Sequence, residues 1–419
     1  MRCEHVSLTG GDPAALAAQL RALVPAADEI ASAVAEIIDR VRVHGDEAVR
    51  DYTQMLDTSG REPPPLRVAA TELAGATNGL DPRVLNALEL AIANVSRVAE
   101  DQRPREEVVD FGTHSVRVRE APLSRAAVYV PGGRAPYPST VVMGVVTARA
   151  AGVAEVVVCS PPGREGELHQ AVLAAAGLTG ASAVYRMGGA QAVAALAHGT
   201  ESVPAVEVIV GPGNLYVQEA KRHVSSHVAI DGFAGPSDLA VIAGEEADPD
   251  LIELDLLAQA EHGDGTLVVA ISRNRVLLAE LHRRLVHAPD TGAVARLVDV
   301  GSAAEALALA EALAPEHLEL IGEDAEALTS RVTRAGCLFV GAASATAFGD
   351  YIAGSNHILP TAGSARFASA LSPACFRRRF YEVAVRAPVK LAEAAAPLAR
   401  AEGFEIHARS MEARIRDND

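Results

Sequence analysis

Residues 125–160 read RAAVYVPGGRAPYPSTVVMGVVTARAAGVAEVVVCS, and the order of their apolar runs indicates the fold class. Two short runs rich in Val, RAAVYV and EVVVCS, enclose an Ala- and Val-rich segment that is long enough for a helix. A strand, a helix and a second strand, with Gly and Pro after the first strand, are typical of a parallel βαβ unit. The stretch therefore predicts an α/β fold.

The same alternation continues along the chain and forms two series. Further candidate strands of the first series lie at 182–187, 206–210 and 227–231. After Gly235 the second series begins, with candidate strands at 239–243, 266–272, 296–301, 317–322 and 337–341. Ala- and Leu-rich helical stretches separate the strands. We expect two Rossmann-like lobes, each built on a parallel sheet, at residues 124–235 and 236–366.

The segments that flank the two lobes differ from them. After an N-terminal segment, residues 1–28, the apolar residues of 29–123 recur with a helical spacing, as in IASAVAEIIDRVRVHGDEAVRDY. We expect this helical part to pack on the second lobe. Residues 367–419 show no strand series, so we expect helices and loops that form a C-terminal arm packed on another surface, either of this chain or of a second subunit.

Composition and charge exclude several classes of function. The formal net charge of −17 argues against a nucleic-acid partner, which needs clustered Lys and Arg. The most apolar stretch, 139–158, is interrupted by Arg149 and Glu155, so we expect no membrane span. Glu4 and Asp12 stand where a secretory signal would be apolar. We therefore expect a cytoplasmic protein.

Two Gly- and Pro-rich turns follow strands of the first lobe. They read VYVPGGRAPYP at 128–138 and VGPGNLY at 210–216, and the chain lacks the G-x-G-x-x-G fingerprint of dinucleotide-binding folds. Each turn is either a plain βα connection or a loop whose backbone amides face an anion. Tyr129, Gln191 and Asn214 lie at or just beyond the carboxyl ends of predicted strands, where open α/β sheets hold ligands.

Candidate metal ligands come from two places in the second lobe. Gln259 and His262 are three residues apart near the end of a helix and share one face, although a solvated helix face has the same spacing. Asp350 and His357 lie in FGDYIAGSNHILPTAGSAR, residues 348–366, which is either a ligand loop or a surface linker. A carboxylate oxygen with imidazole nitrogens suits zinc, so Asp350, His262 and a further His make a candidate site.

Glu316 and His317 place an acid and an imidazole at the boundary of a helix and a strand. The pair is either an ordinary polar turn or a general acid/base pair, because His titrates near neutrality and a neighbouring carboxylate can activate water.

From about residue 30 to His407 the chain resembles the histidinol dehydrogenase family. The resemblance rests on eight motifs in that family's order: YVPGGRAPYPSTVVM, GGAQAVAALAHGT, IVGPGNLYVQEAKR, AGPSD, QAEHG, APEHLEL, GDYIAGSNHILPTAG and EGFEIH. One departure is Asp238, which ends the AGPSD motif where the family commonly has Glu.

The resemblance implies the roles of individual residues. Zinc would be held by Gln259, His262, Asp350 and His407, the last from the partner in a domain-swapped homodimer with a shared active site. The substrate would contact these four residues and also Ser237, His317, His357 and Glu402. NAD would contact Tyr129, Gln191 and Asn214.

The resemblance also implies a reaction. L-histidinol would be oxidised through L-histidinal to L-histidine in two NAD-dependent steps, the last of histidine biosynthesis. His317 would remove the alcohol proton, and Glu316 would activate the water that attacks the aldehyde. One alternative is a sister enzyme on the same scaffold that oxidises another polar alcohol. The other is a non-catalytic metal- or nucleotide-binding scaffold, which would be expected to lack Glu316 or His317.

Overall fold

The structure is a computed structural model and describes residues 1–24, 30–103, 105–132, 135–232 and 236–415. The chain divides into two compact units, one of Met1–Gln102 with Leu123–Phe376 and one of Arg103–Pro122 with Arg377–Asp419. Both predicted α/β lobes fall in the first unit. Residues 133–134 of the first Gly/Pro turn and residues 234–235 of AGPSD lie outside the described residues.

The first lobe is a five-stranded sheet in the order β6-β5-β4-β7-β8, with every pair parallel. Its strands are β4 (Arg125–Tyr129), β5 (Glu155–Ser160), β6 (Ala183–Arg186), β7 (Val208–Val210) and β8 (Ala229–Ile230). The helices between them are α5 (Pro138–Ala150), α6 (Gln170–Leu178), α7 (Gly189–His198) and α8 (Leu215–Val224). The predicted α/β class and every predicted strand of this lobe are confirmed.

The second lobe is a six-stranded parallel sheet in the order β1-β11-β10-β9-β12-β13. Its strands are β1 (Arg2–Ser7), β9 (Asp238–Ala243), β10 (Leu267–Ser272), β11 (Val294–Asp299), β12 (His317–Ile321) and β13 (Cys337–Val340). Its helices include α9 (Pro249–Ala260), α10 (Arg275–Leu285), α11 (Ala303–Leu313) and α13 (Thr346–Tyr351). Between β12 and β13 the chain forms only a short helix, α12 (Glu323–Glu326), followed by a 3-10 turn.

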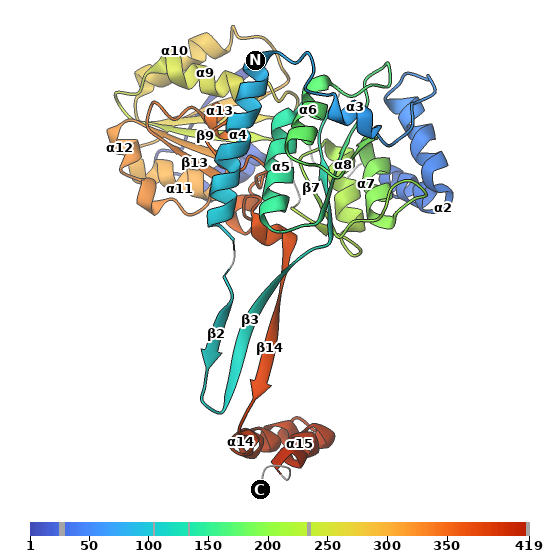
Figure 1. Cartoon of the computed structure of the whole chain (residues 1–419). Coiled ribbons are helices and arrows are strands. Elements are labelled where there is room, and N and C mark those ends of the chain that lie inside the picture. The colour runs from blue at the N-terminus through green and yellow to red at the C-terminus, as the bar shows by residue number, and fades with distance from the viewer. Residues whose placement is uncertain (25–29, 104, 133–134, 233–235, 416–419) are drawn as a thin grey trace. The chain divides into compact units, whose positions relative to one another are not determined.

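Each sheet is buried on both faces, because alternate residues of a parallel strand point to opposite helical layers. In β10, Val269 packs with α1 (Pro13–Arg21) and α11, whereas Val268 packs with α9 and α10. In β4, Val128 packs toward α5 and α6, and Ala127 toward α7. Figure 1 shows the two sheets with helices on either side of each.

The N-terminal quarter of the chain is arranged differently from our prediction. Residues 2–7 form β1 at the edge of the second sheet. The long helices α2 (Ala31–Leu56) and α4 (Pro82–Asp101) pack on the first lobe, not on the second as expected, with Ile38 and Val95 in the cores around the first sheet. An amphipathic stripe shows that one face of a helix packs against an apolar surface, but it does not identify which of the two sheets provides that surface.

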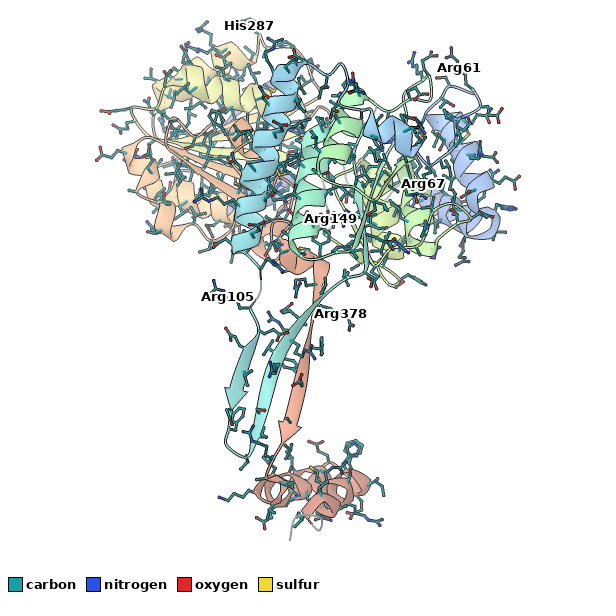
Figure 2. The ribbon with its side chains drawn as sticks, viewed as in Figure 1. Arg61, Arg67, Arg105, Arg149, His287 and Arg378 are labelled. Atoms are coloured by element: carbon teal, nitrogen blue, oxygen red, sulfur yellow. The ribbon has the colours of Figure 1, made fainter. Side chains whose placement is uncertain are left out.

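The second unit is a three-stranded antiparallel sheet followed by helices. The order is β14-β3-β2, formed by β14 (Arg377–Val385), β3 (His114–Pro122) and β2 (Glu107–Asp110), and α14 (Pro388–Ala401) and α15 (Glu405–Glu412) follow β14 (Figure 1). The expectation of a strand-free tail was therefore wrong. Most residues of β14 are exposed, so the strand has no buried face to impose an apolar alternation. Figure 2 shows side chains, among them that of Arg378, projecting from these strands.

None of the helices in the described ranges is long and apolar enough to cross a membrane.

Candidate functional site

A cavity of about 660 Å³ lies between the two lobes of the first unit. On the side of the first sheet it is lined by residues that follow β7 and β8, including Gly211, Asn214 and Asp231. On the side of the second sheet its lining includes Ser237 and His317, at the starts of β9 and β12. The cavity therefore joins the carboxyl edge of one parallel sheet to the amino edge of the other.

Ser237 connects two of the predicted site residues. The Gln259 side-chain amide donates a hydrogen bond to Ser237 Oγ, and this hydroxyl donates to Glu316 Oε2. Gln259 is buried near the end of α9, and Glu316 is the residue before β12. A predicted metal ligand and a predicted water-activating acid are thus linked through one hydroxyl group.

Glu316 is a buried carboxyl, 8% exposed, that borders the cavity. Its Oε2 also accepts a hydrogen bond from the backbone N–H of Asp238, at 3.2 Å. Burial raises the pKa of Glu316 to about 7, although the charge of His317 and the Ser237 hydroxyl act in the opposite direction. A carboxyl with a pKa near neutrality is suited to exchange protons with a reactant at physiological pH.

His317 is 2% exposed and lies against two carboxylates. Its Nε2 is 3.5 Å from Asp350 Oδ1, and its Nδ1 is 3.9 Å from Glu316 Oε2. Burial disfavours the charged imidazole, but Glu316 and Asp350 outweigh this effect and raise the pKa of His317. Nδ1 is buried and has no hydrogen-bond partner among the described residues. Because His317 is part of the cavity lining, its ring can exchange a proton with a ligand there.

His262 and Asp350 are the two predicted zinc ligands that line the cavity. Burial by the surrounding protein lowers the pKa of His262, although its ring is accessible within the cavity, and the charge of Asp350 opposes this shift. The pKa of Asp350 is lowered because the hydrogen bond and charge of His317 outweigh burial. A neutral imidazole and an ionised carboxylate are the forms that bind a metal.

These residues supply some, but not all, of the ligands that a zinc ion needs. Because the Gln259 amide nitrogen donates to Ser237, the amide oxygen is the atom of that side chain that remains for a metal. Within the described ranges, no three His, Cys, Asp or Glu side chains form a metal cluster. The set Gln259, His262 and Asp350 has only two such side chains, so it is suited to zinc only with a ligand added from elsewhere.

His357 lies beside this set and is held at both ring nitrogens. Its Nδ1 is 2.7 Å from the backbone oxygen of Asp350, and its Nε2 is 3.1 Å from Thr140 Oγ1 of α5. Burial lowers its pKa. The ring therefore connects the Asp350 segment to the first lobe and forms part of the cavity wall.

The residues predicted to contact NAD lie at the carboxyl edge of the first sheet. Asn214 lines the cavity and caps α8, where its side chain accepts a hydrogen bond from Val217 N. Tyr129 and Gln191 are buried and lie outside that lining. The backbone N–H of Gly189 donates to the Tyr129 hydroxyl at 3.0 Å. Gln191 Oε1 has no partner among the described residues, so it fits a ligand that brings a hydrogen-bond donor.

Glu402 and His407 belong to the second compact unit, not to the unit that contains the cavity. Glu402 follows α14, His407 lies on α15, and both side chains are exposed.

Sequence reasoning missed a set of charged residues that hold the loops of the cavity. The buried Lys221 forms an ion pair with Asp231 and donates to Gly211 O at 2.9 Å, and Asp231 accepts from Gly211 N at 2.7 Å. Lys221 lies among the buried residues of α8, and a Lys on the apolar side of a helix was the signal that could have identified it. Arg21 and Asp238 form a similar pair, but they are 217 residues apart and no local pattern connects them.

Comparisons with known proteins agree with one another. The sequence model of the histidinol dehydrogenase family matches residues 24–415. The chain is 44% identical over 400 residues to a histidinol dehydrogenase of Parasynechococcus marenigrum, a match that covers 90% of each chain. It is 43% identical over 398 residues to one from Deinococcus radiodurans, covering 91% of this chain and 90% of that one.

A solved structure is also similar. The crystal structure of a histidinol dehydrogenase from Elizabethkingia anophelis superposes with a TM-score of 0.91 at 29% sequence identity. The match covers 99% of this chain and 98% of that one.

Proposed function

The chain belongs to the histidinol dehydrogenase family, and from this premise we propose that it oxidises L-histidinol to L-histidine in two NAD-dependent steps within one cavity. The observation that carries the proposal is the pairing of Glu316 with His317 at the cavity wall. One is a buried carboxyl whose pKa is about 7, and the other is a buried imidazole with an unpartnered Nδ1. Two proton-transfer groups side by side suit a reaction that removes protons from the alcohol, from water and from the hydrate.

NAD and zinc would complete this site. Bound NAD would accept one hydride in each oxidation, and bound zinc would hold the imidazole and amine of the substrate. NAD would lie against Tyr129, Gln191 and Asn214, and the unpartnered Gln191 Oε1 supports this placement. Zinc would be held by Gln259, His262 and Asp350, and His407 of the partner subunit would be its further ligand.

His317 acts in the first oxidation. It takes the hydroxyl proton of the alcohol while a hydride leaves the carbon that bears this hydroxyl, and the product is the aldehyde histidinal. Its Nε2 lies 3.5 Å from Asp350 Oδ1, which orients the ring at the cavity wall.

Glu316 acts as a base between the two oxidations, and its carboxyl must be ionised for this step. It removes a proton from water as the oxygen adds to the aldehyde carbon, and His317 returns its proton to the aldehyde oxygen, which gives the hydrate. His317 then takes a hydroxyl proton of the hydrate while the second hydride leaves for NAD, and the carboxylic acid forms. Ser237 orients the Glu316 carboxylate for this step through its hydroxyl hydrogen bond. Keeping the aldehyde in one cavity between the steps protects a reactive intermediate.

We also propose that the enzyme is a homodimer, in which His407 of the partner subunit completes the zinc site and Glu402 of the partner subunit contacts the substrate. The second unit carries large exposed apolar side chains: Tyr381, Val383, Leu398, Phe404 and Ile406. Exposed apolar groups gathered in one small unit are typical of an interface with another chain. A swapped arm would cover them and deliver the missing ligand.

The substrate is tested with purified protein, NAD and a series of amino alcohols. L-histidinol should give a kcat/KM far above that of amino alcohols without an imidazole, and activity should be lost on chelation and restored by zinc. A comparable or higher kcat/KM with another polar alcohol would favour the sister-enzyme alternative. If protein that retains zinc forms no NADH from any alcohol, the hypothesis of a dehydrogenase is rejected in favour of a non-catalytic scaffold.

A further inference from the structure

Asp238 lies where three segments around the cavity meet. It is the first residue of β9, and its side chain is only 4% exposed. Its Oδ1 accepts a hydrogen bond from the backbone N–H of Glu316 at 2.9 Å, and its Oδ2 accepts one from the backbone N–H of Ala362 at 3.2 Å. One carboxylate therefore joins β9, the turn before β12 and the segment 358–364, part of which lines the cavity.

Arg21, the last residue of α1, supplies the opposite charge. Its Nη1 lies 2.6 Å from Asp238 Oδ2, and its Nη2 lies 3.4 Å from Asp238 Oδ1. Nη2 also donates to the backbone oxygen of Leu313 and, at 3.5 Å, to that of Ala314, at the end of α11. Ala314 has a left-handed backbone with φ of 44°, which turns the chain toward Glu316. The guanidinium thus holds both Asp238 and the turn that leads into Glu316.

The contact between Asp238 and Glu316 is reciprocal. The backbone N–H of Glu316 donates to the Asp238 side chain, and the backbone N–H of Asp238 donates to Glu316 Oε2 at 3.2 Å. Both the backbone and the carboxylate of Glu316 are therefore fixed by the same residue. The next residue is His317, so a displacement of this turn would move both proton-transfer groups.

We propose that Arg21 and Asp238 are positioning residues that hold the Glu316 carboxylate, and through the backbone the His317 ring, in the geometry that the two oxidations require. The inference rests on the proposed function. Neither residue is part of the cavity lining in the described structure, so both act through Glu316. The two-pronged contact with Arg21 fixes the orientation of the Asp238 carboxylate.

The variants Arg21→Gln and Asp238→Asn test this role when each full-length, zinc-loaded enzyme is assayed with histidinol and with histidinal. A displacement of about 1 Å at a reacting group can cost up to about 100-fold in rate. We expect kcat with histidinal to fall at least about tenfold in each variant, with KM for histidinal and NAD within about twofold of wild type. The double variant should lose no more than the worse single variant, because the two residues act as one unit.

A matched control separates positioning from stability. Arg296 is a buried Arg of the same sheet whose Nη2 lies 2.9 Å from Glu4 Oε2, and neither residue lines the cavity. Arg296→Gln should lower the thermal unfolding midpoint and leave kcat per folded molecule unchanged. If Arg21→Gln does not fold, Arg21→Lys replaces it, since Lys keeps the charge but cannot contact both carboxylate oxygens and the Leu313 carbonyl.

The outcomes are distinguishable. A fall in kcat at constant KM, absent from the Arg296 control, supports the positioning role. Losses that scale with the unfolded fraction, as in the control, or an unchanged kcat in Arg21→Lys and Asp238→Asn, would overturn it. If wild-type enzyme oxidises neither histidinol nor histidinal, the proposed function itself has failed.

Discussion

His317 Nε2 lies 3.5 Å from Asp350 Oδ1, while Nδ1 of the same ring is buried and has no hydrogen-bond partner among the described residues. A carboxylate on one side of an imidazole fixes the orientation of the ring. Because Asp350 is also a proposed zinc ligand, one carboxylate would align the base with the bound substrate.

Replacement of His317 by Asn should abolish the first oxidation. General-base catalysis contributes about 10²–10⁴-fold, so NADH formation from histidinol should fall by at least about 100-fold. The zinc content should remain close to that of wild type, because His317 is not a proposed ligand. Stopped-flow NADH absorbance and metal analysis on the same preparation check both points. A variant that retains full activity would remove His317 from the mechanism.

Replacement of Glu316 by Gln should separate the two oxidations. Gln keeps the size of the side chain but cannot take a proton from water, so conversion of histidinal to histidine should fall by about 100-fold or more. Oxidation of histidinol to histidinal should fall much less. Separate assays with the alcohol and with the aldehyde measure the two steps, and equal losses in both would contradict the assignment.

The rate of aldehyde oxidation should depend on pH through Glu316. Burial raises its pKa to about 7 and the base must be ionised, so the rate should rise with pH through about 7 and then level off. The Ser237 hydroxyl stabilises the ionised form, so Ser237→Ala should shift the profile to higher pH. Rates with histidinal from pH 5.5 to 9 check this expectation. An unshifted profile in Ser237→Ala would contradict the stabilisation of ionised Glu316 by the Ser237 hydroxyl.

Mixed dimers should reveal whether the site is shared. Glu316→Gln and His407→Ala should each be defective in converting histidinol to histidine. If His407 of the partner subunit completes the site, a dimer with one chain of each kind has one intact site. Random mixing should then restore about a quarter of wild-type activity. Subunits are exchanged under mild denaturation, with each variant treated alone as control. Activity no higher than in the controls would exclude a shared site.

A buried acid pair should make folding stability depend on pH. Asp255 of α9 and Glu319 of β12 share a hydrogen bond, and burial raises the pKa of both, that of Glu319 to about 9. For a raised acid pKa the stabilisation is complete below the ordinary value of 4.5 and is lost as pH rises through 9. Unfolding midpoints should therefore fall between pH 5 and 9. The fall should be smaller in Glu319→Gln, and an equal fall in both proteins would contradict this role of the pair.

The sequence predicted the strands of both lobes because each is a short apolar run between Gly- or Pro-rich turns, as in 155–160 and 267–272. It did not predict β1 or β14. β1 lies alone at the N-terminus, outside any strand–helix rhythm, and β14 is exposed along almost its whole length. Patterning reveals a strand only where one face or both faces are buried.

The candidate site was predictable only in part. Glu316, His317, His262 and Asp350 were identified, by residue type and by family resemblance, and the structure brings them to one cavity. That the cavity lies at the amino edge of the second sheet was not predictable, because the general rule places ligands at carboxyl edges. Pairs such as Arg21 with Asp238 join residues distant in the chain, and only the fold brings them together.

The number of NADH molecules formed for each molecule of L-histidinol consumed distinguishes two oxidations from one. With limiting histidinol and excess NAD, wild-type enzyme should form two NADH and one histidine. Glu316→Gln should form about one NADH with histidinal as the main product, trapped by a carbonyl reagent. A wild-type yield of one NADH, with the aldehyde as final product, would contradict the two-step mechanism.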